Sequence, residues 1–304
     1  MAEQNRIEQL DAAIDAMLAG RRADSGGEVA ELLATAAELR DVADPHFKAL
    51  LRFKIVPQAR HTLTPHFTVH GAAGLIEFIE NAFGGQEVFR APMPDGSLAH
   101  AVVAIGDSTV EMGDAPKEAE PTRSAIHLYV PNVDALYARA LDAGATAVRP
   151  IVDQFYGDRE GSVDDRYGNR WYIGSPVRAG YRAVTQVLHP RGTDAAIDFI
   201  RTAFGGKLTD EYRTPDGMIV HAVVEVGDSL IELGEHRSDW PGFGAGVHLL
   251  VDDCDAVYQR AVDAGARTVY PPYDAPYGER SAYVVDPWGN RWYIGTPKKK
   301  GLRT

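Results

Sequence analysis

The sequence has one cysteine, no long hydrophobic run and a deficit of positive charge. Cys254 has no second cysteine with which to form an internal disulfide or a cysteine-cluster metal site, and its place in an expected helix favours core packing. No apolar stretch approaches the roughly 18 residues of a membrane span. The N-terminus carries acidic residues where a signal peptide would be apolar. We therefore expect a cytoplasmic protein.

The charge balance excludes the usual polyanionic partners. Lys and Arg number 31 and Asp and Glu 43, which gives a net charge of -12. Such a chain repels phosphate backbones and anionic membrane surfaces. The lysines that begin at Lys298 are interpreted as part of a solvated basic tail, residues 299–304. A small molecule is the expected partner, with no nucleic acid and no membrane.

An internal repeat is the strongest signal in the sequence. A shift of 121 residues places GNRWYIG at 168–174 on GNRWYIG at 289–295, and AFGG at 82–85 on AFGG at 203–206. From Ile76 to Gly174 the two copies share 46 identities in 99 positions without a gap. Shared composition does not produce such a register, so the two halves arose by duplication.

Each copy changes its hydrophobic period in a definite order. A first strand is expected at 64–69, a helix at 75–83 that ends at Gly84, and further strands up to Gly113. The pattern then recurs, with a strand at 126–130 and a helix over 133–141. Asn132 is its expected N-cap and Gly144 its expected C-cap. Three more strands are expected at 146–149, 160–164 and 169–174. Each repeat therefore holds two βαβββ modules.

The repeats do not cover the whole chain. We expect a helical N-terminal segment at 1–60, a first domain at 61–178, a second at 179–298 and the tail at 299–304. The N-terminal segment carries short amphipathic helices whose apolar stripes need a partner surface. That surface is the body of the repeats, a second subunit in a homodimer, or another protein.

The AFGG, GDS, HLYV, YGDR and GNRWYI segments resemble the vicinal oxygen chelate superfamily of glyoxalases, bleomycin resistance proteins and dioxygenases, and within it the PhnB-type proteins. The resemblance implies an α+β fold of two tandem domains, in which paired βαβββ modules curl into a half-open barrel around a ligand. It names a scaffold rather than one reaction, because the superfamily holds both enzymes and non-catalytic binding proteins.

Enzymes of that superfamily hold a divalent metal, Fe, Mn, Ni or Zn, with His and Glu side chains from strands. The resemblance implies Glu111 with His127 in the first repeat and Glu232 with His248 in the second as metal ligands, with the two glutamates as catalytic residues. The family's carboxylate position on the last strand, however, holds Ile173, and its equivalent in the second repeat holds Ile294, and neither can bind a metal.

These residues can also be interpreted without a metal. Each Glu and His can form a hydrogen-bonded pair with no metal. On the first strand, Thr64 or His66 could occupy a ligand position, but the second repeat has Thr185 and Val187 there. His100 and His221 open the third strand of each repeat and could join the site, although exposed histidines are common at strand ends.

Further residues are candidates for ligand binding in the cavities. The YGDR and YGER loops could place an arginine on an anionic group with a tyrosine packed on the ligand, although a loop-bracing ion pair is an alternative. Two tryptophans could line the cavity or fill the core, and one more lies on a linker between modules. These candidates are Tyr156, Arg159, Tyr277, Arg280, Trp171, Trp292 and Trp240.

Two functions remain open at this point. One is metal-assisted isomerase, lyase or oxygenase chemistry on a small oxygenated or anionic molecule. The other is metal-free binding or sequestering of such a molecule, as in resistance proteins, without a cofactor.

Overall fold

The computed structural model describes residues 61–154, 157–175, 181–238, 242, 244–275 and 278–298. These residues belong to one unit, His61–Thr304. Several expectations lie outside the described residues: the helical segment 1–60, the tail 299–304, Tyr156, Tyr277 and Trp240. No helix in the described ranges is long and apolar enough to span a membrane.

The first repeat forms two modules of the expected kind, each a strand, a helix and three strands. Module 1 consists of β1 (Leu63–Val69), α4 (Ala72–Phe83), β2 (Gln86–Pro92), β3 (Leu98–Ile105) and β4 (Ser108–Asp114). Module 2 consists of β5 (Ala125–Tyr129), α5 (Val133–Asp142), β6 (Thr146–Asp153), β7 (Arg159–Asp164) and β8 (Arg170–Ser175).

The second repeat forms two more modules with the same order of elements. Module 3 consists of β9 (Val184–Leu188), α6 (Thr193–Phe204), β10 (Lys207–Arg213), β11 (Ile219–Val226) and β12 (Ser229–Leu233). Module 4 consists of β13 (Gly246–Leu250), α7 (Cys254–Asp263), β14 (Arg267–Ala275), β15 (Glu279–Val285) and β16 (Arg291–Pro297). The α+β architecture expected from the sequence is confirmed.

Helix ends follow the capping residues that the sequence supplies. The Asn132 side chain accepts a hydrogen bond from the Ala135 backbone N–H and so starts α5 as predicted. Helix α4 ends at Gly84, whose φ of 70° favours glycine. The C-cap of α5 is Ala143 rather than the predicted Gly144, which follows it with a φ of 95°.

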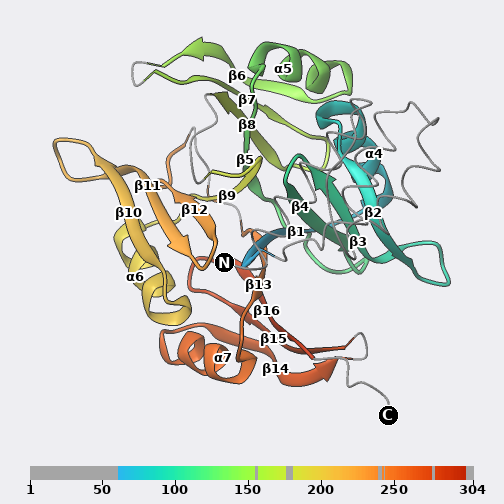
Figure 1. Ribbon diagram of the computed structural model, residues 1–304, viewed down its shortest axis with the longest axis vertical. Helices are drawn as coiled ribbons and strands as arrows, with labels where there is room; N and C mark the ends of the chain where they lie inside the picture. The colour runs from blue at the N-terminus through green and yellow to red at the C-terminus, as the bar shows by residue number, and fades with distance from the viewer. Residues whose placement is uncertain are drawn as a thin grey trace, which may run out of the picture. The chain divides into compact units, whose positions relative to one another are not determined.

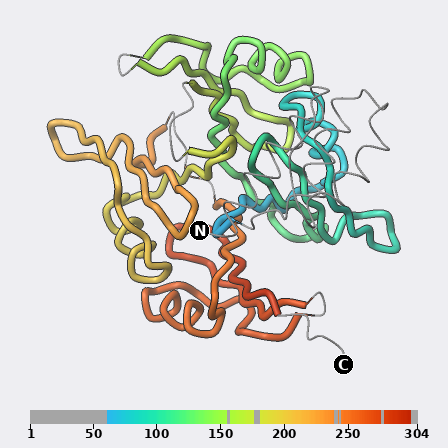
Figure 2. Tube along the Cα trace, in the orientation of Figure 1, coloured from blue at the N-terminus to red at the C-terminus, as the bar shows by residue number. Residues whose placement is uncertain are grey.

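The modules combine across the repeats rather than within them. Sheet A has the strand order β14-β15-β16-β13-β1-β4-β3-β2, and sheet B has the order β10-β11-β12-β9-β5-β8-β7-β6. Sheet A therefore joins module 1 to module 4 through the antiparallel pair β1–β13, and sheet B joins modules 2 and 3 through β5–β9 (Figures 1 and 2). Each sheet receives half of its strands from each repeat.

The helices bury one face of each sheet. Trp171 and Trp292 are fully buried in two separate cores, where they contact Phe83 and Phe204 respectively. The indole N–H of Trp292 donates to Asp286, which also accepts from the side chain of Asn290 in the preceding turn. The repeated GNRW motif is thus explained as a turn and a core anchor. Cys254 is also buried in a core, as expected.

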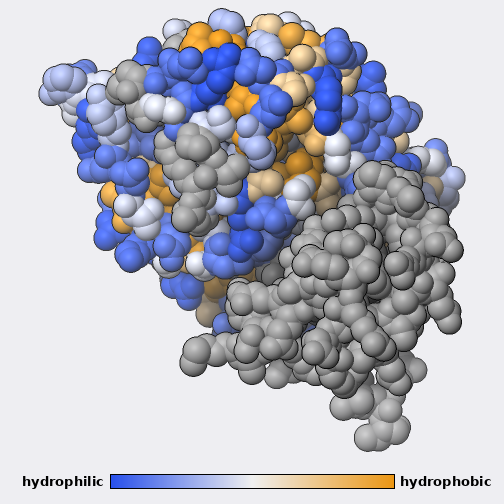
Figure 3. Space-filling model, turned by 45° about the horizontal axis from the view of Figure 1, so that its top comes forward, coloured by the Kyte–Doolittle hydropathy of each residue, from blue (hydrophilic) through white to orange (hydrophobic). Residues whose placement is uncertain are grey.

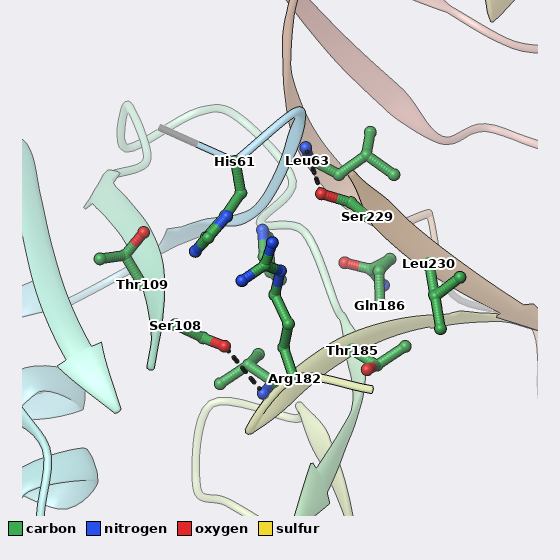
Figure 4. A pocket seen from close by; sticks show the side chains of 11 residues that line it. His61, Leu63, Ser108, Thr109, Arg182, Thr185, Gln186, Ser229 and Leu230 are labelled. Carbon is green, nitrogen blue, oxygen red and sulfur yellow. Dashed lines mark hydrogen bonds between the residues drawn. The ribbon is translucent and has the colours of Figure 1, made fainter. Parts of the chain in front are cut away.

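The repeated GDS turn joins one repeat to the other. Asp228 accepts from the Thr62 backbone N–H and Ser229 accepts from that of Leu63, at the start of β1. In the mirrored contact, Asp107 and Ser108 accept from the backbone N–H groups of residues 183 and 184 at the start of β9. Figure 4 shows Ser108 and Ser229 with their hydrogen bonds. A cavity of about 20 Å³ between these turns has room for one water and no larger ligand.

Candidate functional site

The glutamates and histidines singled out in the sequence do meet, but with exchanged partners. His248 Nδ1 lies 2.9 Å and 3.1 Å from the two carboxylate oxygens of Glu111, and His127 Nδ1 lies 3.0 Å from Glu232 Oε2. The prediction that Glu111 sits with His127, and Glu232 with His248, is therefore wrong. The cause is strand order, because β13 rather than β5 pairs with β1, and β4 pairs with the other edge of β1.

Two further histidines complete the cluster in sheet A. His66 on β1 is in register with Glu111 on β4, and His100 lies on β3 beside it. One ligand atom from each of His66, His100 and Glu111 lies within 4.8 Å of the others. We call the set His66, His100, Glu111, His248 and Glu279 site A.

The charges in site A follow from burial and from close carboxylates. Burial would raise the pKa of Glu111, but His248, His66 and His100 lower it to about 2. Burial would lower the pKa of His248, but Glu111 and then Glu279 raise it to about 10. Burial lowers the pKa of His66 to about 4, and it also lowers that of His100. At neutral pH the site holds two carboxylates, Glu111 and Glu279, with one imidazolium and two neutral imidazoles.

Glu279 closes the other side of His248. Its Oε1 lies 3.5 Å from His248 Nε2 and accepts a hydrogen bond from Ser281 Oγ. Gly295 on the neighbouring strand makes room for this contact, because a Cβ there would overlap the Glu279 carboxylate and lie 2.9 Å from His248 Nε2. The last glycine of GNRWYIG is thus required by the site.

The equivalent place in sheet B has a different structure. Glu232 Oε2 faces His127, and Glu232 Oε1 accepts a 2.6 Å hydrogen bond from the Tyr129 hydroxyl. The His127 and Tyr129 rings stack at 4.0 Å. We call His127, Tyr129 and Glu232 site B. All three side chains are buried, and both carboxylate oxygens are occupied.

Two sequence differences between the repeats produce this contrast. Val187 stands where sheet A has His66, and Tyr129 stands where sheet A has Leu250. Sheet B therefore loses one nitrogen ligand, and a tyrosine covers its glutamate. Within the residues that the structure describes, only His66, His100 and Glu111 form a group of three or more side chains that could hold a metal ion.

The loop arginines proposed as ligand-binding residues brace the fold. Arg159 donates to both carboxylate oxygens of Asp134 and to Asp153. Arg280 makes the equivalent contacts with Asp255 and Asp274. The guanidinium groups tie a strand to the start of a helix, and the ion pairs are exposed. This arrangement favours the loop-bracing interpretation. Trp171 and Trp292, with no exposed surface, favour the core interpretation.

One ligand-sized hollow lies away from site A. It has a volume of about 340 Å³ and is formed by α4, the β3–β4 turn, β5 and α5. Its wall includes Tyr129 and Tyr181, whose rings meet edge to face at 4.7 Å. Figure 3 shows apolar side chains reaching the surface in patches between hydrophilic ones.

Sequence reasoning identifies His66 and His100 only as secondary candidates, because the second repeat has Val187 in place of His66 and because strand-end histidines are commonly exposed. It misses Glu279, which lies in the YGER loop segment. The alternation of side chains along a strand could have identified it. Glu279, Ser281 and Tyr283 lie on one face of β15, the face that also carries site A.

Comparison with known proteins agrees with this arrangement. The family model described as Glyoxalase/Bleomycin resistance protein/Dioxygenase superfamily matches residues 59–173 and 188–294. The uncharacterized protein Rv0887c of Mycobacterium tuberculosis is 42% identical over 127 residues, which cover 38% of this chain and 75% of that protein. The uncharacterized protein Mb0911c of Mycobacterium bovis is 42% identical over 127 residues, 38% of this chain and 84% of its own.

Solved structures share the fold at low identity. Glyoxalase I from Zea mays has a TM-score of 0.62 and 16% identity, over 77% of this chain and 92% of that one. A putative dioxygenase from Bacillus subtilis has a TM-score of 0.55 and 14% identity, over 79% of this chain and 87% of that one. The narrower PhnB-type assignment stays a prediction. The family match extends over both repeats, and the chain belongs to the glyoxalase, bleomycin resistance protein and dioxygenase superfamily.

Proposed function

We propose that the chain is a divalent-metal-dependent enzyme whose metal is held in sheet A by His66, His100 and Glu111. The observation that carries the proposal is the convergence of three ligand atoms within 4.8 Å. Two imidazoles and a carboxylate suit Fe, Mn, Ni or Zn. His66 Nδ1 is buried and makes no hydrogen bond within the described residues. Because buried polar atoms are normally paired, this nitrogen is available to coordinate a metal.

The surrounding residues supply orientation and a proton. His248 donates to Glu111 and fixes the direction of its carboxylate, the usual role of a group behind a metal ligand. His248 Nε2 also faces Glu279, so this pair can hold or release a proton at the margin of the site. A bound metal would polarise the oxygen atoms of a substrate. We infer isomerase, lyase or oxygenase chemistry on a small oxygenated molecule.

Site B is proposed to be a structural ion pair without a metal. Burial would raise the pKa of Glu232, but His127 lowers it, and Tyr129 adds a hydrogen bond. A metal at Glu232 would have to displace both His127 and Tyr129 from the carboxylate. Val187, at the position equivalent to His66, cannot serve as a ligand. The earlier assignment of His127 and Glu232 as metal ligands is therefore not part of this proposal.

The metal proposal is tested with matched variants of the two sheets. Protein purified without chelators is expected to bind about one equivalent of Fe, Mn, Ni or Zn. Glu111→Gln is expected to lower the affinity at least a hundredfold, and His66→Val, which copies sheet B, at least tenfold. Glu232→Gln is the control and should retain the metal. Less than about a tenth of an equivalent in the wild type, or equal losses in Glu111→Gln and Glu232→Gln, would reject the proposal.

A second candidate function rests on the 340 Å³ hollow beside Tyr129, which lies in the size range of small-molecule pockets. Here the protein would bind an apolar molecule without a metal or catalysis. Tyr181→Ala should then weaken binding at least tenfold, while Glu111→Gln leaves it unchanged. Ligand binding that follows Glu111 instead would exclude this alternative.

A further inference from the structure

A row of aromatic side chains crosses the face of sheet A opposite to the face on which α4 and α7 pack. Tyr270 on β14 lies opposite Tyr283 on β15, Tyr283 lies opposite Tyr293 on β16, and Tyr293 lies opposite His248 on β13. Directly opposed residues share a face of the sheet. The neighbouring positions Ala282 and Val284 point to the other face and pack in the core with α7. The tyrosines therefore lie on the same face as site A.

The rings lie within reach of one another and of the metal ligands. Tyr283 and Tyr293 stack with 4.7 Å between ring centroids and 21° between planes. Tyr270 lies 6.0 Å from Tyr283, and Tyr293 lies 4.5 Å from the ring of His66. This set, Tyr270, Tyr283 and Tyr293, is named the tyrosine row. It leads from the edge of the sheet to the centre of site A.

The outer end of the row is exposed to solvent. Tyr270 is 59% exposed, and Tyr273 beside it is 44% exposed. A tyrosine placed for packing alone would bury its ring, as the tyrosines nearer the centre partly do. Tyr270, tilted by 37° against Tyr283 at the end of the row, presents an exposed flat apolar surface to a ligand.

Sheet B shows that the fold itself does not require these tyrosines. Its equivalent row is Arg149, Ser162, Tyr172 and His127, held by the same strand register. Arg149 there lies 3.7 Å from Glu160. Only the residue next to the histidine is a tyrosine in both sheets, so the outer two rings are particular to the sheet that carries the metal-compatible cluster.

We propose that the tyrosine row binds a flat aromatic molecule of two or more fused rings, which stacks on Tyr283 and Tyr270 and directs its oxygenated end toward His66 and Glu111. The orientation rests on the proposed metal function, whereas the stacking does not. A second ring would reach beyond Tyr293 to the two outer tyrosines, Tyr283 and Tyr270, which a single ring held at site A would not reach.

The test uses two neutral probes that differ by one ring, phenol and 2-naphthol, titrated by calorimetry and by naphthol fluorescence. The metal-free and the Mn²⁺-loaded proteins are both measured. Tyr283→Leu is expected to weaken 2-naphthol binding at least tenfold and phenol binding less than threefold. Tyr270→Leu, at the exposed end, should weaken 2-naphthol about threefold to tenfold without a risk to folding.

Controls separate this proposal from its alternatives. Tyr212→Leu, an exposed tyrosine on β10 of sheet B, should change neither affinity. If 2-naphthol binding is lost in Tyr129→Leu and unchanged in Tyr283→Leu and Tyr270→Leu, the ligand occupies the other hollow and the proposal is overturned. If the variants of the tyrosine row act as expected but Glu111→Gln retains its metal content, the metal proposal fails and the aromatic site stands.

Discussion

His189 shows, at the scale of one residue, how burial determines charge. It is nearly fully buried next to site B, where its Nε2 lies 3.1 Å from the Tyr172 hydroxyl. Burial lowers its pKa to about 4, so the ring is neutral in the folded protein at pH 7. In sheet A the equivalent residue is Thr68.

This neutral histidine predicts an acid-dependent loss of stability. The unfolded chain binds this proton near pH 6.5 and the folded chain only near pH 4. The free energy of unfolding therefore decreases as the pH falls from 6.5 to 4. Between pH 7.5 and pH 4.5 the wild type should lose about 2 kcal/mol more unfolding free energy than His189→Thr. Urea denaturation at the two pH values measures this. Parallel losses in both proteins would contradict it.

Gly295 leads to a second prediction at this scale. Gly295→Ala should push the Glu279 carboxylate and the His248 ring from their places and weaken metal binding at least tenfold, with the fold retained. Its counterpart Gly174→Ala would press on His127 in sheet B and should leave metal affinity unchanged. Metal titration with Mn²⁺ compares the two variants. Equal effects would show that the glycine acts on the fold and not on the site.

The roles of individual residues were predictable where they depend only on neighbours in the sequence. Glu111 follows from its place on a strand, and the Asn132 cap follows from its sequence neighbours. The partner of Glu111 did not follow, because His127 in SAIHLYV and His248 in AGVHLLV occupy similar local sequence contexts. Which of them meets Glu111 depends on hydrogen bonds between strands far apart in the chain.

At the scale of elements, the GDS turns combine a local and a distant role. Each makes the tight hairpin that the sequence predicts, and each also binds the first strand of the other repeat. The Asp228 side chain has more partners than that of Asp107, since it also contacts His61 and Arg182, whereas His61 meets only the backbone oxygen of Asp107.

The two aspartates are therefore expected to differ in their contribution to stability. Asp228→Ala should lower the unfolding free energy by about 1 to 2 kcal/mol, discounted for its exposure, and Asp107→Ala by about 0.5 to 1 kcal/mol. Thermal and urea unfolding of both variants measure the difference. A larger loss in Asp107→Ala would argue against the contacts with His61 and Arg182.

Strand positions followed from hydrophobic period and turn residues, and β1, β5, β7 and β8 begin within one residue of the expected starts. The sequence pattern did not predict the full length of strands whose residues are exposed at the sheet edges. Strand β6 continues to Asp153 although its residues are mostly exposed, because pairing with β7 rather than burial sustains it.

At the scale of the whole molecule, neither sheet can be formed by one repeat within one chain. Residues 61–178 supply modules 1 and 2, which belong to different sheets. Expressed alone, this repeat is expected to dimerise, with its β1 pairing with β5 of a second copy as β1 pairs with β13 here. Light scattering coupled to gel filtration would measure the mass. A folded monomer at micromolar concentration would contradict the expectation.

The exchange of modules also constrains how the gene can change. Tandem repeats are prone to unequal crossing-over, which deletes one copy at a stroke. In this protein such a deletion would remove His248 from Glu111 and Glu232 from His127 together. Within one chain, the remaining copy would lack these partners, and it could rebuild a Glu–His pair only across a dimer of two chains, whereas two retained copies are free to diverge at positions such as Tyr283 and Ser162.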